Sequence, residues 1–338
     1  MNQEWLQTLA AAGFRADSSD FGDPRGELDA VARATVVCPL VDTGIIRASG
    51  EDAPGFLHNL LTNDVSGLDA ATVRRAGFCT PKGRLLADFL MWRAGEDFLL
   101  QLPMELLPAM QKKLTMYVLR SKVKLTDAST GRCVIGLAGS DAAALAAQVC
   151  GKAPAVGQQV AFESGQVLGL IGNRFEVVVA AAKAPTLWQQ LSAAATPAGL
   201  AAWRWSEIAA GDPRIVQATQ EQFIPQMINY VQVGGLSFKK GCYPGQEIVA
   251  RTQYLGKIKR HMLRARLDAG SAVPGDSVYA PETGDQACGT VVSVAPSPQG
   301  GSELLAVVQM SCAEAGELHL GNSTGSRLEL LELPYSLD

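Results

Sequence analysis

A cysteine placed among cationic residues is the first candidate for chemistry in this sequence. Cys242 follows Lys239, Lys240 and Gly241, and the residues YPGQE of 243–247 follow it. Ammonium groups beside a thiol in a loop favour the thiolate, which is the form of cysteine that attacks electrophiles and binds metals. Cys242 is therefore a candidate functional thiol. The alternative is an inert thiol, because cysteine is among the most buried residue types.

The residues next to Cys242 add backbone freedom and polar groups. A glycine on each side of the cysteine allows a tight turn or the close approach of a ligand to the backbone. Gln246 and Glu247 contribute an amide and a carboxylate within the same turn. The structural alternative is a turn that precedes a strand or a helix, in which Glu247 pairs with Lys240 or Arg251.

The cysteine also begins a basic stretch within an acidic chain. Residues 239–266 contain eight Lys or Arg and one acid, which gives +7 in a chain whose net charge is −4. A polyanion such as RNA phosphate or a polyglutamate tail would be attracted to this charge. The alternative is a solvated strand with alternating basic residues. The cations are Lys239, Lys240, Arg251, Lys257, Lys259, Arg260, Arg264 and Arg266.

The remaining cysteines and the histidines indicate no metal site. Seven scattered cysteines, an odd number, fit reduced thiols in the cytoplasm better than a disulfide framework. The chain has no CxxC pair, and its three histidines, His58, His261 and His319, lie in no recognisable family context. No signal peptide and no membrane-spanning run is visible. We expect a cytoplasmic protein with no membrane partner.

The elements that position these groups mix short strands and helices without a regular βαβ alternation. This mixture favours an α+β fold over a doubly wound sheet. Residues 17–25 are expected to form a polar connector, and the Thr62-Asn63-Asp64 stretch a polar exit from a helix, with side chains suited to capping or to ligand contacts. Expected strands lie at 36–40, 41–50, 74–80, 85–92, 97–102, 122–126 and 133–137, and between 158 and 180. Expected helices lie at 4–12, 51–61, 103–116, 141–149 and 185–194.

The last third of the chain has a different pattern. Short strands separated by Gly, Pro and Asp indicate a small barrel or sandwich. Those strands are expected at 259–267, 277–280, 287–294, 304–310 and 326–332. A chain of 338 residues is also too long for one ordinary core, so two or three domains are expected.

Two tryptophans lie one residue apart in a helical stretch before this region. Trp203 and Trp205 point in different directions if the stretch is a helix, so one could be buried while the other lines a cavity. A planar heteroaromatic ligand would stack on such a ring. The residue pattern alone assigns both indoles to the core.

The octet KGCYPGQE at 240–247 resembles the signature of the YgfZ family of folate-binding proteins, which is related to the T protein, the aminomethyltransferase of the glycine cleavage system. The K-G-C-Y-x-G-Q-E pattern is specific to YgfZ-like proteins and absent from true aminomethyltransferases. Similar stretches occur at 60–65 (LLTNDV), 82–84, 121–123, 222–226 and 333–337. The resemblance covers about residues 36–338.

The resemblance implies an α+β fold with three domains in a cloverleaf ring and a C-terminal β-barrel. The implied ranges are an N-terminal extension at 1–35, an aminomethyltransferase-like folate-binding region of two interleaved α+β domains at 36–250, and the barrel at 256–338. The implied cofactor is tetrahydrofolate or a derivative. The implied role is accessory: support of Fe–S cluster assembly or repair and of Fe–S enzymes, including those that modify tRNA. Implied partners are folate, Fe–S enzymes or assembly proteins, and a weak tRNA contact.

The resemblance also transfers to individual residues. Trp203 matches a tryptophan associated with folate binding, while a second family tryptophan falls at Thr43. The T protein has paired aspartates where this chain has Ala87-Asp88, and a pterin-binding glutamate where this chain has Ala209. The implied cofactor-binding residues are Trp203, Thr43, Asp88, Asn63, Lys240, Tyr243, Gln246, Glu247 and Arg251.

These departures bear on catalysis. Activation of a folate nitrogen for aminomethyl transfer needs a placed acid or base, and only Asp88 survives from the T-protein carboxylates. The resemblance therefore favours a folate-binding accessory protein with Cys242 as its working thiol. The alternatives are a folate-dependent one-carbon transferase and a tRNA-binding module that acts through residues 251–266.

Overall fold

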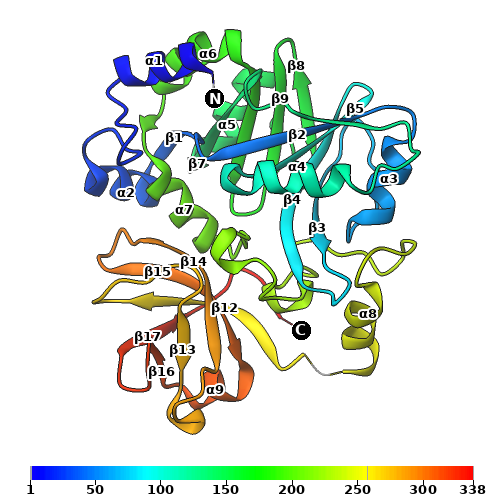
Figure 1. Cartoon of the computed structure of the whole chain (residues 1–338). Coiled ribbons are helices and arrows are strands. Elements are labelled where there is room, and N and C mark those ends of the chain that lie inside the picture. Colours follow the sequence, from blue (N-terminus) through cyan, green and yellow to red (C-terminus); the bar gives the residue numbers. More distant parts are fainter. Residues whose placement is uncertain (1, 257, 338) are drawn as a thin grey trace. The chain divides into compact units, whose positions relative to one another are not determined.

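The computed structural model describes residues 2–256 and 258–337 (Figure 1). The chain divides into two compact units. Unit 1 contains Met1–Phe56, Val65–Arg74 and Leu90–Ser206, and unit 2 contains Leu57–Asp64, Arg75–Phe89 and Glu207–Asp338. The division falls inside four elements: α3 (Ala53–Leu60), β3 (Val73–Cys79), β4 (Leu85–Ala94) and α7 (Leu200–Ala209).

Unit 1 contains a six-stranded sheet of order β11-β1-β7-β10-β9-β8. Neighbouring strands are antiparallel except β1 and β11, which are parallel. The strands are β1 (Thr35–Pro39), β7 (Arg132–Gly139), β8 (Gln159–Phe162), β9 (Gly165–Leu170), β10 (Arg174–Ala180) and β11 (Thr196–Pro197). Side chains alternate between the two faces of a strand, so Cys133, Ile135 and Leu137 of β7 enter one hydrophobic core while Val134 and Ala138 enter another.

Three helices cover the first of these faces. They are α1 (Gln3–Ala11), α5 (Ala142–Cys150) and α6 (Ala184–Ser192), and each contributes apolar side chains to one core cluster. Trp5 of α1 packs edge-on against Trp188 of α6, with ring centroids 5.8 Å apart. The amino-terminal helix is therefore part of the core of unit 1.

A helix occupies part of the expected polar connector. α2 covers Pro24–Arg33, where the Asp23 side chain accepts a hydrogen bond from the backbone N–H of Gly26 and Pro24 begins the first turn. This arrangement of an N-cap acid followed by proline is favourable for a helix start. The expectation of a connector over residues 17–25 was wrong at its end, because the charged residues of α2 hid its apolar face.

A five-stranded sheet of order β3-β4-β5-β2-β6 faces the second core of unit 1. Its remaining strands are β2 (Thr43–Ser49), β5 (Asp97–Pro103) and β6 (Lys124–Asp127), and α4 (Leu107–Thr115) packs against β2 and β6. Ile45 and Leu99 of this sheet share a core with Val178 of the six-stranded sheet. The apolar space between the two sheets also holds Trp203.

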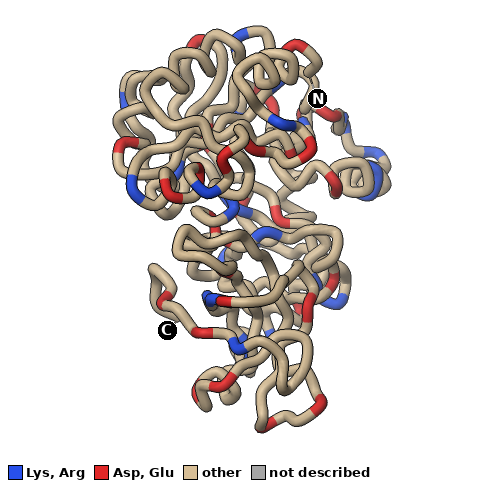
Figure 2. The backbone as a smooth tube through the Cα atoms, turned by 90° about the vertical axis from the view of Figure 1, so that its left-hand side faces the viewer, with Lys and Arg blue, Asp and Glu red and all other residues tan. Residues whose placement is uncertain are grey.

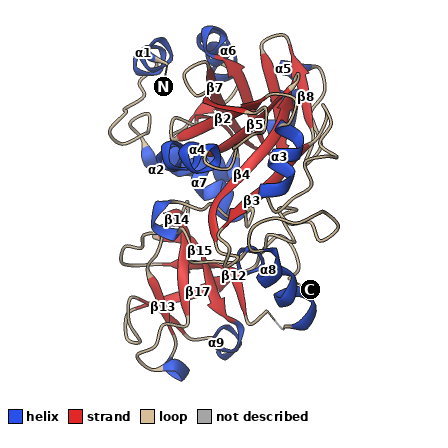
Figure 3. Ribbon diagram, turned by 45° about the vertical axis from the view of Figure 1, so that its right-hand side comes forward, coloured by secondary structure: helices blue, strands red, loops and turns tan. Residues whose placement is uncertain are grey.

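The carboxyl-terminal part of unit 2 is a closed barrel of order β12-β15-β14-β13-β16-β17 (Figure 3). Its elements are β12 (Arg260–Leu267), β13 (Ser277–Tyr279), β14 (Gly289–Pro296), β15 (Ser302–Gln309), α9 (Met310–Ala315), β16 (Leu318–Leu320) and β17 (Ser326–Leu331). The predicted C-terminal β-barrel is confirmed, and five of its strands lie close to their expected positions. The three-residue β16 was not among the expected strands.

Residues 210–256, which precede the barrel, form mostly loops and short 3₁₀ turns, with one α-helix near their end. α8 covers Gln246–Leu255 and begins directly after the YPG turn. Short 3₁₀ turns occur at Met104–Leu106, Ala181–Lys183, Gln217–Thr219, Pro225–Ile228 and Pro281–Thr283. Within the part of the chain that the structure describes, no helix combines the length and the apolar character needed to cross a membrane.

The α+β expectation is confirmed by these mixed, mainly antiparallel sheets. The three-domain ring and the boundaries 1–35, 36–250 and 256–338 stay predictions. Unit 1 includes α1 and α2 as well as the six-stranded sheet.

Replacing Gly136 by alanine should destabilise unit 1. A Cβ at Gly136 would lie 2.6 Å from Cε3 of the buried Trp203 ring. Overpacking of this kind costs about 1–3 kcal/mol, which chemical denaturation would measure as a lower free energy of unfolding. Gly131→Ala is the matched control, because its Cβ would meet nothing nearer than 3.8 Å. Equal stability of the two variants would contradict the close packing of Trp203 on β7.

Candidate functional site

The signature loop, residues 239–247, is held by Lys240. Its ammonium group donates hydrogen bonds to the backbone carbonyls of His58 and Leu61, the second over 2.5 Å, and lies 5.0 Å from the centroid of the Tyr243 ring. These carbonyls lie at the end of α3, where backbone acceptors have no partner within the helix. Lys240 therefore caps the end of α3, and its charged group serves to hold the loop to that helix.

Partial burial changes the acidity of this ammonium group. It lowers the pKa of Lys240 to about 8, while negative charge on Asp64 and Cys242 opposes that shift. The tyrosine ring beneath the ammonium group is itself buried, with 7% of Tyr243 exposed.

Gly245 allows close packing at the other end of the loop. Gly245 has φ of +81°, and a Cβ there would lie 2.4 Å from the carbonyl oxygen of Thr80 and 2.6 Å from Cα of Gly83. The backbone of the loop therefore rests directly on the turn at residues 80–83. No side chain fits in this space, and the positive φ is one that glycine adopts without strain.

Two polar side chains attach the residues that lead into the loop. Thr62 Oγ1 donates to the carbonyl of Gly235 over 2.7 Å, and Asn63 Nδ2 donates to the carbonyls of Gly234 (2.7 Å) and Arg75 (2.8 Å). Asn63 Oδ1 accepts from the backbone N–H of Asp64. The amide of Asn63 is thus used within unit 2, and its predicted cofactor contact stays a prediction.

The thiol at the centre of the loop is accessible. All seven cysteines are in the described residues, and among them Cys242 alone is exposed. Burial raises the pKa of the Cys79 and Cys133 thiols to about 12, which suits inert core residues. The loop therefore presents one reactive candidate on a backbone that is fixed on both sides.

His58 lies beside this loop, although sequence reasoning gave it no role. Its Nδ1 is 3.1 Å from Oδ1 of Asp64, and its Nε2 is 3.7 Å from the position of a Cβ on Gly241, the neighbour of Cys242. The sequence feature that could have drawn attention to His58 is the polar stretch at 62–64, which was expected to cap a helix or contact a ligand. This stretch begins four residues after the histidine.

The other predicted residues of the octet lie at the start of α8. Gln246 Nε2 is 3.5 Å from the carbonyl oxygen of Gly241, a long contact, and Glu247 is exposed in the first helical turn. An acid in that position interacts favourably with the helix dipole. Arg251 is exposed on the same helix. No predicted pairing of Glu247 with Lys240 or Arg251 is present among the described contacts.

The cations of the basic stretch, residues 239–266, differ in their partners. Arg264 forms an ion pair with the buried Glu303, at 2.5 Å, and Arg266 pairs with Asp268 at 2.7 Å. Lys257 lies outside the described residues. Four other cations of the basic stretch have no hydrogen-bond or ion-pair partner within residues 2–256 and 258–337, and all four are exposed: Lys239, Arg251, Lys259 and Arg260. Figure 2 shows cations and acids interspersed along the backbone in its view.

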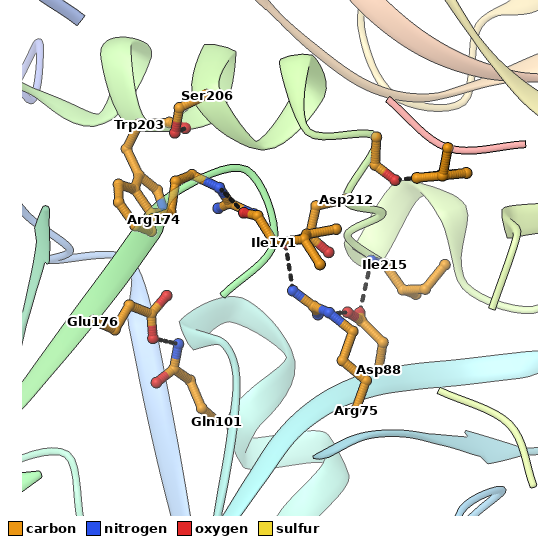
Figure 4. A network of polar contacts seen from close by, with 12 residues as sticks. Arg75, Asp88, Gln101, Ile171, Arg174, Glu176, Trp203, Ser206, Asp212 and Ile215 are labelled. Carbon is orange, nitrogen blue, oxygen red and sulfur yellow. Dashed lines mark hydrogen bonds and ion pairs between the residues drawn. The ribbon is translucent and has the colours of Figure 1, made fainter. Parts of the chain in front are cut away.

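Asp88 lies in a buried network of charges within unit 2 (Figure 4). Its Oδ1 accepts a hydrogen bond from the backbone N–H of Ile215 over 2.7 Å, and its Oδ2 is 3.7 Å from Arg75. Arg75 in turn forms a 2.5 Å ion pair with Asp212. Burial raises the pKa of Asp88 to about 6, against the opposing charge of Arg75. For Arg75, burial lowers the pKa, but the negative charges of Asp212 and Asp88 outweigh it and hold the value above the ordinary one.

The buried hydroxyl of Tyr230 completes this region. It is fully buried and has no hydrogen-bond partner among the described residues. Burial raises its pKa, and the negative charge of Asp88 adds to the effect. Asp88 is therefore surrounded by groups of its own unit, with only 5% of its surface exposed.

The predicted residues of unit 1 are also buried. Trp203 is fully enclosed, with the Arg174 guanidinium 5.1 Å from its ring centroid (Figure 4). Gln101 Nε2 donates to Glu176 Oε2 over 2.6 Å between the two sheets. Gln101 Oε1 and Thr43 Oγ1 have no hydrogen-bond partner in the described chain. The core position that the residue pattern gave Trp203 is what the structure shows, and its contact with folate stays a prediction.

Comparisons with known proteins identify the family. A profile of the GCVT N-terminal domain matches residues 10–205. The tRNA-modifying protein YgfZ of Escherichia fergusonii is 30% identical over 312 residues, which covers 88% of this chain and 93% of the relative. The chain belongs to the YgfZ family. The tRNA-modifying protein YgfZ of Serratia proteamaculans is 29% identical over 303 residues, covering 88% of this chain and 92% of the relative.

A solved structure supports the fold of this YgfZ-family chain. The glycine cleavage system aminomethyltransferase T from Bartonella henselae superposes with a TM-score of 0.71 at 17% identity, over 100% of this chain and 98% of the other. The predicted likeness to the T-protein fold is confirmed. At this identity the likeness extends to the fold alone.

Gly245→Ala should loosen the signature loop of this YgfZ-family chain. Alanine at positive φ costs roughly 1–2 kcal/mol, and the clash with Thr80 and Gly83 adds to that cost. We expect a lower melting temperature and faster proteolytic cleavage within residues 239–247. Gly241→Ala is the control in the same loop, because its nearest contact would be an ordinary 3.7 Å. If both variants behaved as wild type, the close seating of Gly245 would be wrong.

The stability contribution of Asp88 should depend on pH. Its pKa is about 6 in the folded protein against an ordinary value of 3.8, so the folded chain binds the proton more tightly. The contribution is then fully present below about pH 4 and lost as pH rises through 6. Asp88→Asn keeps an acceptor for Ile215 but does not titrate. Between pH 7 and 4, urea unfolding should show wild type gaining on the order of 2 kcal/mol relative to this variant. A constant difference would contradict the raised pKa.

Proposed function

We propose that this chain is a folate-binding accessory protein that supports Fe–S cluster assembly or repair and Fe–S enzymes, including those that modify tRNA, with Cys242 as its working thiol. The observation that carries the proposal is the signature loop. Lys240 and Gly245 fasten it on both sides, and Cys242 is left exposed between them. A fixed, exposed thiol is suited to chemistry on a partner or small molecule.

The relatives support the tRNA part of this role. Two of them carry the name tRNA-modifying protein YgfZ and match over most of both chains. Scattered reduced thiols, most of them buried, agree with work in the cytoplasm. Fe–S enzymes or assembly proteins are the partners that the family resemblance proposes.

Tetrahydrofolate or a derivative is the proposed cofactor, and unit 1 offers polar atoms that fit a pterin. Thr43 begins β2, and on the same face of the sheet Gln101 lies opposite Ile45, two residues further along. Both carry a buried oxygen with no partner in the described chain, and the Glu176 carboxylate lies beside Gln101. Buried polar atoms of this kind are normally satisfied by a ligand or by water. When bound, a tetrahydrofolate would supply one-carbon chemistry, while Thr43, Gln101 and Glu176 would orient its N–H groups.

The T-protein reaction is less well supported. Asp88 is the surviving carboxylate, but it is buried against Arg75 and Ile215 and bonded within unit 2. A general acid or base must reach the proton that it transfers. We therefore propose that Asp88 has a structural role within unit 2 and that this chain is not an aminomethyltransferase.

A weak tRNA contact is the second candidate. The exposed cations without partners in the described chain, Lys239, Arg251, Lys259 and Arg260, could meet phosphates or a polyglutamate tail. Phosphate binding would weaken as salt rises, because neutralised phosphates release counterions. The acidic net charge of −4 argues against tight non-specific binding.

Cys242→Ser should abolish the accessory role. In a strain that lacks the chromosomal copy, wild-type protein should restore the activity of an Fe–S-dependent tRNA-modifying enzyme, measured as the modified nucleoside in total tRNA. The serine variant should restore little of it, because a hydroxyl does not replace a thiolate as nucleophile. Cys150→Ser, at a partly exposed cysteine of unit 1, is the matched control and should restore fully.

Folate binding by the purified proteins separates the two parts of the proposal. Tetrahydrofolate should quench tryptophan fluorescence equally in wild type and in Cys242→Ser, and Gln101→Leu should weaken the binding. Full restoration by Cys242→Ser would overturn the thiol role. Absence of binding to the wild-type protein would overturn the folate role.

A further inference from the structure

The exposed side of α4 and the turn that follows it form an apolar and basic surface on unit 1. We propose that this surface, residues 108–124, binds an acidic amphipathic helix of a partner protein. An apolar side chain of the partner enters a hollow on α4, and the partner's carboxylates meet the cations around that hollow. The proposal goes beyond the proposed function, because it depends neither on Cys242 nor on folate.

The hollow lies on the exposed side of α4. The other side of this helix buries Leu107, Met110 and Leu114 where the helix packs on β2 and β6. Four of the residues that line the hollow have the spacing i, i+3, i+4 and i+7, which places them on one stripe of a helix. The hollow has a volume of about 460 Å³ and is lined by Pro108, Gln111, Lys112, Thr115 and Met116.

Two apolar side chains near the hollow are exposed to solvent. Met116 is 70% exposed and Leu119 is 89% exposed. The three Cα–Cα steps between them span at most about 11 Å. Tight turns hold this part of the chain, because the backbone N–H of Val118 bonds to the carbonyl of Thr115 and that of Ser121 to the carbonyl of Val118. Exposed apolar side chains that lie together indicate a contact surface for another molecule.

The backbone at Leu119 supports a role in binding. Its φ is +45°, in the left-handed region where leucine is strained and where glycine or asparagine is the usual residue. Burial of the side chain does not offset this strain, because 89% of Leu119 is exposed. Strain of this kind is found at ligand-binding and switch regions. The leucine is therefore better explained by a contact with a partner than by the packing of unit 1.

The charge around the hollow favours an acidic partner. Residues 112–124 contain five cations and no acid, although the whole chain has a net charge of −4. Lys122 pairs with Glu51 over 2.5 Å. Three of the other cations are exposed and have no ion-pair partner within residues 2–256 and 258–337: Lys112, Arg120 and Lys124. Carboxylates on a partner would complement these charges and favour its correct orientation.

The apolar features favour a protein over RNA. Binding of single-stranded RNA combines cations with several aromatic rings on which bases stack, whereas residues 108–124 contain one aromatic side chain, Tyr117. An exposed methionine and an exposed leucine beside a hollow fit the apolar centre of a protein interface, with cations at its rim. An amphipathic helix with apolar residues on one face and acids on the other supplies both kinds of contact.

The test is the binding of a fluorescein-labelled helical peptide that carries leucines at i, i+3, i+4 and i+7 and glutamates on its other face. We expect fluorescence anisotropy to show binding to the wild-type protein, with an affinity that falls as salt rises. Leu119→Asn, Met116→Ser and Arg120→Glu should each weaken binding at least about fivefold. Val156→Ser, which alters another exposed apolar residue of unit 1, is the matched control and should bind as wild type.

Thermal unfolding separates a binding role of Leu119 from a structural one. Asparagine tolerates the left-handed conformation, so Leu119→Asn should melt at or above the wild-type temperature while it loses affinity for the peptide. A lower melting temperature of this variant would contradict the binding role. Absence of peptide binding to wild type, or equal binding by all the variants, would overturn the proposal. Tighter binding of a single-stranded RNA oligonucleotide or of anionic phospholipid vesicles than of the peptide would overturn it as well.

Discussion

The ammonium group of Lys240 must find acceptors once it leaves water, and the carbonyls of His58 and Leu61 provide them at a helix end that would otherwise lack donors. This contact fixes one side of the signature loop, and the seat of Gly245 on the turn at 80–83 fixes the other. The loop that carries the exposed Cys242 is thereby held to the end of α3. Lys240 therefore has a structural role, although it belongs to the basic stretch. An anion could be bound only by the other, exposed cations of that stretch.

The same logic applies to the buried charges around Asp88. In this chain Asp88 is balanced by Arg75, and Arg75 by Asp212, so the buried charges satisfy one another within unit 2. Removal of one partner from such a network leaves an uncompensated charge and is costly. In unit 1 the satisfaction is incomplete, because Gln101 and Thr43 retain buried oxygens without partners in the described chain.

Much of the framework was accessible from the pattern of residues. The strands expected at 41–50 and 133–137 and the helices expected at 51–61 and 141–149 correspond to elements that the structure contains. The same holds for the short strands separated by turn residues in the last third of the chain. α2 was missed because its apolar face is narrow. The charge count correctly identified a basic stretch, but it could not tell that Arg264 pairs with Glu303 or that Lys240 caps a helix.

The sequence by itself determined the chemistry that is available: one octet with a thiol between glycines, the family to which that octet points, and an α+β fold that ends in a barrel. Only the tertiary structure decided which groups meet. Lys240 and His58 are 182 residues apart, and Arg75 and Asp212 are 137 apart. Local propensity carries no information about such distant pairs. They form because a buried polar group must be matched by whichever partner the folded backbone brings to it. For that reason Cys242 was visible in the sequence, while the contact of Lys240 with the carbonyl of His58 became visible only in the fold.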